Sequence, residues 1–263
     1  MVRTALWIAA ARAAESSRVD RLFNDPWAAE LAGEVGRKML AASPPNPFLP
    51  VRTRYFDDRV AESCSIGGQL VLLGAGMDTR AYRLDLPRGL RVYEIDHPEA
   101  FVEKESVLSE ARLQLERCVV RADLSGAWQR ELLGSGFRPE RHTVWLAEGL
   151  FFYLEQSQVQ HLLLGAAELS GPGSVFLADM FGSGLLTLPS MQDFVLKKKQ
   201  AGLPLPFCTD DPHQLFAAQG WPTVEIAEPG SAKANFGRMR ALPSESLTQS
   251  SSTSRSYLVS GVR

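Results

Sequence analysis

The feature that most constrains the fold is a series of short apolar runs that begins at residue 69. Helical patterns near residues 98–116, 125–135 and 155–170 separate the early runs. Runs that are apolar at consecutive positions are typical of strands covered on both faces of a sheet. Strands that alternate with helices predict a parallel, doubly wound α/β sheet. The expected strands are residues 69–73, 91–95, 118–121, 143–147, 174–178, 223–227 and 256–259.

The residues before the first expected strand are predicted to form a helical cover over positions 1–65. The Asn-Asp pair before Pro26 can cap a helix, and a proline is tolerated at the first helical position because its missing N–H would be unpaired there. The proline-rich stretch 42–50 is predicted as a loop. Residues 51–65 then resume as a short helix.

A longer connection follows the fifth expected strand, and residues 180–215 would form a cap insertion. Asp211 before Pro212 signals a helix that Gly220 closes, and the lysine run 197–199 is predicted as a solvated helix face. No helical pattern separates the last two expected strands, so we expect them to pair antiparallel. The whole chain of 263 residues is expected to form a single domain.

Composition argues against several classes of function. The formal net charge of −2 lacks the basic surplus typical of nucleic-acid-binding proteins and of polybasic membrane anchors. The first apolar stretch lies at the short end for a signal peptide and runs directly into Arg12 and Glu15, so an alanine-rich helix is the better prediction. No segment approaches the ~18 apolar residues of a membrane span. The three widely spaced cysteines form no disulfide framework, and no metal-ligand cluster is present. We expect a cytoplasmic protein without a bound metal, and its oligomeric state stays open.

The strongest candidate site is the turn after the first expected strand, which carries Gly74 and Gly76. Two glycines let the backbone turn tightly and let a ligand press against it. Asp96 ends the second expected strand 20 residues after Gly76, the spacing at which an acid reaches ribose hydroxyls. A plain strand–helix turn and a helix cap at Asp96 are the alternatives, but the two features together favour a nucleoside site.

Two side chains of this turn discriminate between nucleosides. Thr79 stands where dinucleotide sites have a third glycine, which helps to place the pyrophosphate at a helix N-terminus. Asp78 adds a negative charge that would repel a phosphate. S-adenosylmethionine has no phosphate and carries an ammonium and a sulfonium. The turn therefore favours S-adenosylmethionine over NAD.

The third and fourth expected strands also end in acids. Asp123 follows the third strand and can accept from an adenine amino group while Leu124 packs on the ring, and Glu148 follows the fourth strand. Ligands of open α/β sheets bind outside the carboxyl ends of the strands. We therefore expect these residues to line one site with Gly74 and Asp96.

Motifs spread across nearly the whole chain carry a family resemblance. The most diagnostic are the Asp25-Pro26 dipeptide and the turn 74–80, and the others are residues 11–16, 23–28, 51–58, 93–98, 123–124, 148–150 and 153–154. On these motifs the chain resembles the leucine carboxyl methyltransferase superfamily. Within it, the chain is similar to bacterial S-adenosylmethionine-dependent methyltransferases and polyketide carboxyl O-methyltransferases of the tetracenomycin type. The resemblance implies a seven-stranded methyltransferase fold with a helical N-terminal cover, and S-adenosylmethionine as cofactor.

The resemblance also implies roles for single residues. Asp96 would bind the ribose, and Asp123 and Leu124 would lie at the adenine. Gly74 and Glu148 would line the methionine portion of the cofactor.

The same resemblance implies that an arginine of the segment 51–56 binds the carboxylate of the cofactor. Arg52 and Arg54 both fit this role, and Arg54 is the preferred candidate. The resemblance is weakest over residues 180–250, where the acceptor would be chosen. The identity of the acceptor therefore does not carry over.

The acceptor side offers few catalytic groups. A carboxylate acceptor is ionised at neutral pH and needs no general base, whereas a phenol would need one. Among the histidines, His213 in the insertion is the candidate base, and an ordinary exposed helix position is the alternative. The helical cover and the insertion would together enclose a pocket lined by Tyr153, Phe181 and Phe207.

The sequence thus predicts an S-adenosylmethionine-dependent O-methyltransferase. Its acceptor would be a carboxylate or phenol of a small, polyketide-type molecule, rather than nucleic acid or a membrane. A protein C-terminal carboxyl methyltransferase is the alternative within methyl transfer. An NAD-dependent oxidoreductase and a catalytically silent cofactor-binding regulator are the alternatives of other classes.

Overall fold

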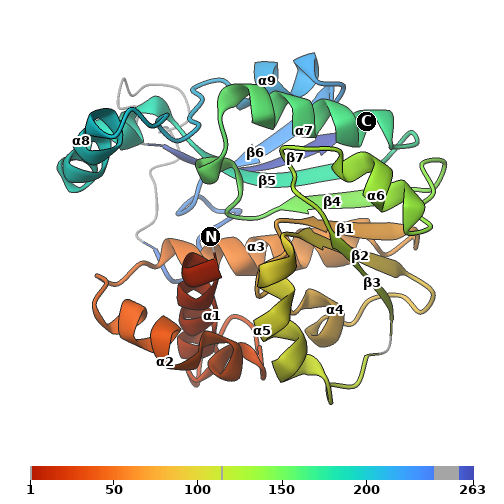
Figure 1. Ribbon diagram of the computed structural model, residues 1–263, viewed down its shortest axis with the longest axis horizontal. Helices are drawn as coiled ribbons and strands as arrows, with labels where there is room; N and C mark the ends of the chain where they lie inside the picture. Colours follow the sequence, from red (N-terminus) through yellow and green to blue (C-terminus); the bar gives the residue numbers. More distant parts are fainter. Residues whose placement is uncertain (1, 114, 240–254) are drawn as a thin grey trace.

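The computed structural model describes residues 2–113, 115–239 and 255–263. Within these ranges a seven-stranded sheet of order β3-β2-β1-β4-β5-β7-β6 forms the centre of the molecule (Figure 1). The first five strands pair in parallel, and β7 runs antiparallel between β5 and β6, so both expectations about strand direction are confirmed. The strands are β1 (Gln69–Leu73), β2 (Arg91–Asp96), β3 (Glu116–Arg121), β4 (Thr143–Ala147), β5 (Val175–Phe181), β6 (Thr223–Ala227) and β7 (Ser256–Val262).

Alternate residues of the central strands enter two different cores. Val71 and Leu73 of β1 pack into a core with three helices on one face, while Leu70 and Leu72 pack into a core on the other. All five residues of β1 are buried, which is why its sequence is apolar at nearly every position. The first face is covered by α6 (Trp128–Gly134), α7 (Gln156–Glu168) and α9 (Pro212–Ala218), and the second by α3 (Phe48–Ser63) and α4 (Arg80–Arg83).

Several helix boundaries differ from the expected ones, and two of them show the reason. The helix expected over 51–65 begins at Phe48. Pro50 is tolerated in its first turn, because the backbone N–H that proline lacks would have no acceptor within the helix at that position. The helix expected over 98–116 ends at Leu108, its last buried residue, and the exposed residues that follow give it no face to pack. This helix is α5 (Pro98–Leu108).

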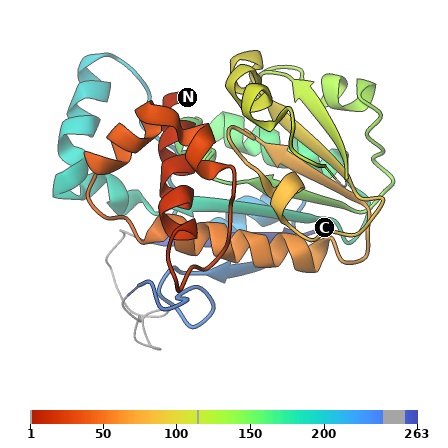
Figure 2. The same ribbon diagram turned by 90° about the horizontal axis from the view of Figure 1, so that it is seen from below.

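The first two helices form a separate small layer. Leu6 and Ala9 of the first helix pack on Leu31 of the second, and Met77 of the turn after β1 completes this cluster. Figure 2 shows the two helices side by side, at one end of α3. The helical cover expected before the sheet is therefore present as α1 (Val2–Ser16), α2 (Ala28–Ala41) and α3.

The connection after β5 is a loop whose two ends are tied together at a neck. Thr209 N–H donates to the Phe181 carbonyl at 2.9 Å, and the Asp210 carboxylate accepts the N–H and the hydroxyl of Ser183 at 2.9 and 2.6 Å. The helix within this loop contributes no buried side chain and projects from the molecule (Figure 1). The loop contains η2 (Ser183–Thr187), η3 (Pro189–Met191) and α8 (Gln192–Gln200).

Candidate functional site

The carboxyl ends of β1 to β5 open onto a cavity of 990 Å³, at the upper end of the range of about 300–1,000 Å³ typical of small-molecule sites. One wall is the turn after β1, which has positive φ at Gly74 (+65°) and Gly76 (+43°). A Cβ on Gly74 would lie 3.0 Å from the Leu150 side chain, and one on Gly76 would lie 3.2 Å from that of Ala5. Backbone conformation and space therefore both favour glycine at these positions.

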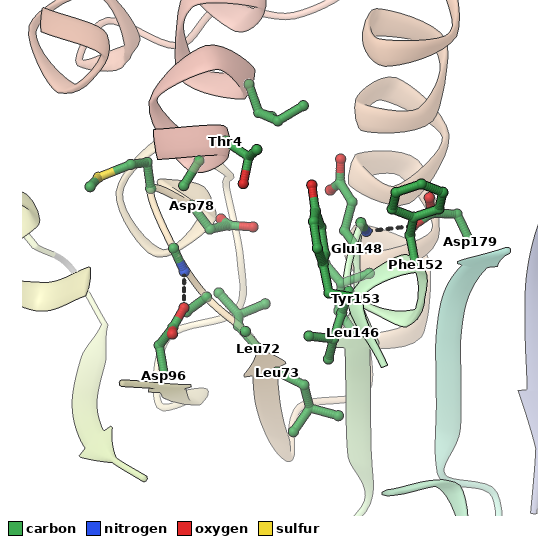
Figure 3. Close-up of a pocket in the computed structure, with 18 of the residues that line it drawn as sticks. Thr4, Leu72, Leu73, Asp78, Asp96, Leu146, Glu148, Phe152, Tyr153 and Asp179 are labelled. Atoms are coloured by element: carbon green, nitrogen blue, oxygen red, sulfur yellow. Dashed lines mark hydrogen bonds between the residues drawn. The ribbon is translucent and has the colours of Figure 1, made fainter. Parts of the chain in front are cut away.

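Asp96, at the end of β2, holds this turn in place. Its Oδ2 accepts the Gly76 N–H at 2.8 Å, as Figure 3 shows, and its Oδ1 accepts the His97 N–H at 2.7 Å. The side chain lines the cavity, and each carboxylate oxygen has a second lone pair. Asp96 can therefore bind hydroxyl groups of a ligand while it holds the turn.

Asp123 and Leu124 follow β3 and line the same end of the cavity. Asp123 Oδ1 accepts the hydroxyl and the N–H of Ser125 at 2.7 and 2.8 Å, and these bonds lower the pKa of the carboxyl group. His97 Nε2 lies 3.9 Å from the same oxygen. Asp123 is therefore an ionised acceptor on an exposed part of the cavity wall.

Glu148, directly after β4, is the centre of a buried ion-pair network. Its Oε1 accepts from Arg52 Nε at 3.0 Å, and its Oε2 accepts from Arg80 Nη2 at 2.5 Å. Arg52 Nη1 also donates to Asp179 Oδ2 at 2.9 Å, and Asp179 Oδ1 accepts the Gly149 N–H at 2.5 Å. The ends of β4 and β5 are thus joined to α3 through charged hydrogen bonds.

Arg80 extends this network beneath the glycine turn. It donates to Asp57 at 2.8 Å and to Asp78, and Arg83 donates two further bonds to Asp57. Every side chain in the network is at most 14% exposed. These ion pairs join Arg52, Arg80 and Arg83 with Asp57, Asp78, Glu148 and Asp179, and Arg83 Nε also lies 4.0 Å from Asp25 Oδ2, which connects the Arg12–Asp25 pair to them.

Burial and the arginines act in opposite directions on the carboxylates at the cavity wall. Burial raises the pKa of Asp78, but the cations Arg80, Lys104 and Arg83, of which Arg80 acts most strongly, together outweigh it and bring the pKa to about 2. For Glu148 burial is likewise outweighed, by Arg80 and Arg52, and its pKa lies below the usual value. Burial prevails at Asp179, whose pKa is raised despite Arg52. Asp78 and Glu148 therefore present negative charge to the cavity.

α1 closes the cavity beside the glycine turn. Arg12 donates to Asp25 Oδ2 at 2.8 Å and to the Met77 carbonyl at 2.5 Å, and the Thr79 hydroxyl donates to the same Asp25 oxygen at 2.7 Å. The expected helix cap at the Asn-Asp pair is wrong, because α2 begins at Ala28 and Asp25 is buried in this contact instead. The residues of α1 that line the cavity are Thr4, Ala5, Trp7, Ile8 and Arg12.

The other end of the cavity is aromatic, and its rings come from three separate elements. The ring of Phe181, at the end of β5, lies 5.8 Å from that of Phe48 and 5.9 Å from that of Phe152. Figure 3 shows Phe152 and Tyr153 across the cavity from Asp96. The aromatic half of the cavity is lined by Phe48, Phe152 and Tyr153 of η1 (Phe151–Tyr153), Phe181, Leu185 and Met191.

Comparison with known proteins identifies the family. The profile of the leucine carboxyl methyltransferase family matches residues 5–167, more than half of the chain. The chain belongs to this family.

Two relatives illustrate the extent of the similarity. A protein of Parafrankia sp. named "Putative S-adenosyl-L-methionine-dependent methyltransferase" is 43% identical over 187 residues, which cover 65% of this chain and 60% of that protein. A protein of the same name from Saccharopolyspora erythraea is 40% identical over 191 residues, with coverage of 65% and 64%. The chain thus matches about three fifths of the length of these relatives.

Two crystal structures share the fold. A putative methyltransferase from Thermobifida fusca superposes with a TM-score of 0.61 at 15% identity, covering 93% of this chain and 94% of that one. A DUF574 family protein from Streptomyces avermitilis gives a TM-score of 0.58 at 15% identity, covering 97% and 96%. The seven-stranded methyltransferase fold expected from the sequence is therefore confirmed.

Three general expectations concern membranes, metals and thiols. In the part of the chain that the structure describes, no helix has the length and apolarity to cross a membrane. The described histidines, cysteines and acids include no group of three or more arranged to hold a metal ion. Cys64, Cys118 and Cys208 are all free, and burial raises the pKa of the Cys64 thiol to about 12.

The structure brings most of the predicted site residues of this family member to one cavity. They come from the carboxyl ends of five neighbouring strands, as the parallel sheet requires. The predicted residues that line the cavity are Gly74, Gly76, Asp96, Asp123, Leu124, Glu148, Tyr153 and Phe181.

Arg54 does not lie at the cavity, whereas Arg52 does. Two positions along a helix differ by about 200° in direction, so the two arginines point to opposite sides of α3. Arg54 pairs with Asp58 at 2.9 Å and donates to the Leu22 carbonyl at 2.9 Å. The spacing of Arg54 and Asp58, four residues apart, is the sequence signal that separates a surface pair from a ligand-binding arginine.

Two other predicted residues lie outside the cavity, and two of the phenylalanines that line it were not predicted. Phe207 is 6% exposed and packs edge-on against Phe151 in the core, so its assignment to the acceptor pocket is wrong. His213 is exposed on α9, away from the lining residues, so the geometry does not support it as a base. Phe48 was missed because it falls in the stretch expected to be a loop. Phe152 was missed although it precedes Tyr153 directly.

Proposed function

We propose that this chain binds S-adenosylmethionine and transfers its methyl group to an oxygen of a small molecule. Asp96 would bind the ribose hydroxyls, and Asp123 with Leu124 would hold the adenine. Glu148 would accept from the ammonium of the methionine portion. Arg52 would donate to its carboxylate, since a guanidinium has five N–H donors and Arg52 uses only Nε and Nη1 in its two carboxylate bonds.

The observation that carries this proposal is the sign of the charge in the cavity wall. Acids outnumber arginines among the described residues that line the cavity, even without Asp179, whose pKa burial raises: they are Asp78, Asp96, Glu99, Asp123 and Glu148 against Arg12, Arg52, Arg80 and Arg83. Burying an uncompensated charge is costly unless an opposite charge joins it. The ammonium and sulfonium of S-adenosylmethionine would supply that charge. The pyrophosphate of NAD would instead add negative charge beside Asp78.

Bound S-adenosylmethionine supplies a methyl group that its sulfonium already activates. The chain's own residues would hold the acceptor oxygen in line with that group, and alignment of this kind can contribute about 7–11 kcal/mol. A carboxylate acceptor would need no proton removed, because its pKa of about 4 leaves it ionised at neutral pH. Asp179, beside the aromatic half, already accepts from Arg52 and Gly149, which makes it a poor base for a phenol. This supports a carboxylate acceptor.

The wall of the aromatic half supports a small molecule over a protein tail. A peptide in extended form would need several polar partners for its backbone, whereas this half is lined mainly by rings and apolar side chains. A polyketide-type acid fits such a wall better. Three free cysteines support a reducing compartment, and we propose the cytoplasm as the location.

Calorimetry on the whole chain with S-adenosylhomocysteine and with NADH tests the cofactor. We expect a one-to-one complex with S-adenosylhomocysteine and no heat with NADH. A folded protein that shows no heat with millimolar S-adenosylhomocysteine would contradict the proposal.

A cofactor-consumption assay over polyketide acids, phenols and carboxyl-terminal peptides then tests the acceptor. Turnover should be found with acids. Turnover with peptides alone would favour a protein carboxyl methyltransferase, and cofactor binding without any turnover would favour a silent regulator.

A further inference from the structure

We infer that Asp179 is a proton-binding site of the cavity and that it takes up a proton when S-adenosylmethionine or S-adenosylhomocysteine binds. This inference rests on the proposed function, which brings the carboxylate of the ligand to Arg52. It gives a role to an acid that the proposed function leaves without one. The side chain of Asp179, near the end of β5, is 2% exposed and lines the cavity beside Glu148 (Figure 3).

The guanidinium of Arg52 cannot fully compensate three carboxylates. It already donates from Nη1 to Asp179 Oδ2 at 2.9 Å and from Nε to Glu148 Oε1 at 3.0 Å. The carboxylate of the ligand would be the third anion. On Nη2 it would lie within about 4–6 Å of Asp179, because the two terminal nitrogens of a guanidinium share one carbon. A like charge at such a distance disfavours the ionised form of a carboxyl group.

Asp179 is the acid that becomes protonated, because it has the fewest cationic partners. Glu148 also accepts from Arg80 at 2.5 Å, and its pKa lies below the usual value. Among the described residues, Asp179 forms an ion pair with Arg52 alone, and burial raises its pKa despite this pair and despite the Gly149 N–H, while the charge of Glu148 raises it further. The other elements packed against β5 here, η1 and β7, contain no residue that is charged at neutral pH. The carboxylate of the ligand would therefore raise this pKa again.

The two oxygens of Asp179 have different partners, and protonation would change only one of them. Oδ1 accepts the Gly149 N–H at 2.5 Å, which fixes the turn after β4. A proton from the solvent would form an O–H bond at Oδ2. This ends the bond from Arg52 Nη1 and releases that N–H for the ligand, and the new hydroxyl of the carboxyl group is itself a donor. Arg52 and neutral Asp179 would then both hold the carboxylate of the ligand, and the turn would stay in place.

The uptake of a proton makes the affinity for the ligand depend on pH in a known direction. Such a ligand binds more tightly as the pH falls through the interval between the pKa values of the free and the occupied protein. This interval lies above the ordinary 3.8, because burial raises the pKa of Asp179 in the free chain and the ligand raises it further. With one proton taken up, the affinity changes by up to about tenfold for each pH unit.

Calorimetry on the whole chain, in pairs of buffers with different enthalpies of ionisation, counts the protons taken up. The two ligands are S-adenosylhomocysteine and 5′-methylthioadenosine, which has the same adenosine and a thioether but no amino-acid part. Over about pH 5–7 we expect S-adenosylhomocysteine to bind with uptake of a proton and to bind more tightly as the pH falls. 5′-Methylthioadenosine should show neither effect, because it brings no carboxylate to Arg52.

Asp179→Asn identifies the group that takes up the proton. Asparagine keeps an oxygen for the Gly149 N–H but cannot be protonated in this range. The variant should lose the proton uptake, and its affinity for S-adenosylhomocysteine should be nearly constant over about pH 5–7 and, at the upper end, at least equal to that of the unmodified chain. Asp58→Asn is the matched control, because Asp58 is half exposed, pairs with Arg54 and lies outside this cavity. It should keep the proton uptake of the unmodified chain.

The possible results separate this inference from the proposed function. If both ligands bind with equal proton uptake, or if Asp179→Asn keeps the uptake, the proton site is wrong and the cofactor assignment stands. An affinity that Asp179→Asn lowers by the same factor at every pH would make Asp179 only a support for Arg52 and would also overturn the inference. If Asp179→Asn does not fold, the comparison of the two ligands on the unmodified chain still decides. If S-adenosylhomocysteine fails to bind, the proposed function is wrong and the inference fails with it.

Discussion

Replacing Arg80 by methionine tests whether the buried network holds the site together. Arg80 is 2% exposed, and its guanidinium donates to Asp57, Asp78 and Glu148. Methionine is long and unbranched, so Arg80→Met removes the charge while it fills part of the same space. Three buried carboxylates then lose a charged partner at once.

The loss of folding stability in Arg80→Met depends on the hydrogen-bond partners that each of the three carboxylates retains. Asp57 retains two bonds from Arg83, and Glu148 retains Arg52. Asp78 keeps only the backbone N–H of residue 80 among its hydrogen bonds. Removing one member of a buried pair costs about 3–5 kcal/mol, and the retained partners place this change near 3 kcal/mol. At about 2–4 °C per kcal/mol, the melting temperature should fall by roughly 6–12 °C.

The loss should also depend on pH with a definite sign. In the native chain the pKa of Asp78 is about 2, below the ordinary 3.8. Its stabilising contribution is therefore present above pH 3.8 and lost as the pH falls toward 2. In Arg80→Met, burial without the guanidinium raises this pKa, so the carboxylate opposes folding at neutral pH and is relieved by protonation. The difference between the two proteins should be largest near pH 7 and should shrink toward pH 4.

Urea denaturation followed by circular dichroism at several pH values measures this difference, with Arg54→Met as the control. Arg54 is partly exposed and pairs with Asp58 four residues on, a type of pair worth about 0.3–0.5 kcal/mol. The control should leave both the stability and the affinity for S-adenosylhomocysteine nearly unchanged, whereas Arg80→Met should weaken both. The reasoning is refuted if Arg80→Met and Arg54→Met have the same free energy of unfolding at pH 7, or if the difference between their free energies of unfolding grows as the pH falls.

Four further expectations concern the cofactor, the acceptor and metals. Asp96→Ala should weaken the binding of S-adenosylhomocysteine by about 10- to 150-fold in calorimetry, which corresponds to the free energy of one charged hydrogen bond. An unchanged affinity in a folded variant would mean that Asp96 only supports the glycine turn. Phe181→Ala should raise the KM for the acceptor and leave the affinity for S-adenosylhomocysteine within about twofold of that of the unmodified chain. A variant that loses only affinity for the cofactor would contradict this. Phe207→Ala should instead lower the free energy of unfolding by about 3–5 kcal/mol and leave that KM unchanged, because its ring is in the core. A chelator should leave the activity unchanged. If a chelator abolished the activity and a divalent ion restored it, the chain would need a metal.

The cofactor end of the site could be predicted from the sequence because it depends on local patterns. A strand buried on both faces is apolar at nearly every position, so its end is visible where Gly74 or an acid interrupts the run. Parallel strands then bring their carboxyl ends to one edge. Asp96, Asp123 and Glu148 therefore reach one cavity although their strands are separated by helices in the sequence.

The rest of the site could not be predicted because it depends on which surfaces pack together. Only the four-residue spacing of Arg54 and Asp58 distinguishes Arg54 from Arg52 in the sequence, and it is the packing of α3 against β5 that directs Arg52 to Asp179. Phe152 and Phe207 are equally apolar, but one lines a cavity and the other fills the core. The amino-acid type shows that a side chain is apolar, but it does not show whether that side chain contacts other protein side chains or a ligand.

The neck of the loop after β5 makes the chain suited to segment grafting. The bonds of Thr209 to Phe181 and of Ser183 to Asp210 keep the two ends of this loop adjacent while β5 and β7 stay in the sheet. Doubling the length of a loop whose ends are already adjacent costs only about 0.6 kcal/mol in entropy. The family profile ends at residue 167, before this loop begins. Chimaeras joined at the neck would therefore change only the loop that contributes Leu185 and Met191 to the cavity, and we expect them to keep the strand ends proposed to bind the cofactor.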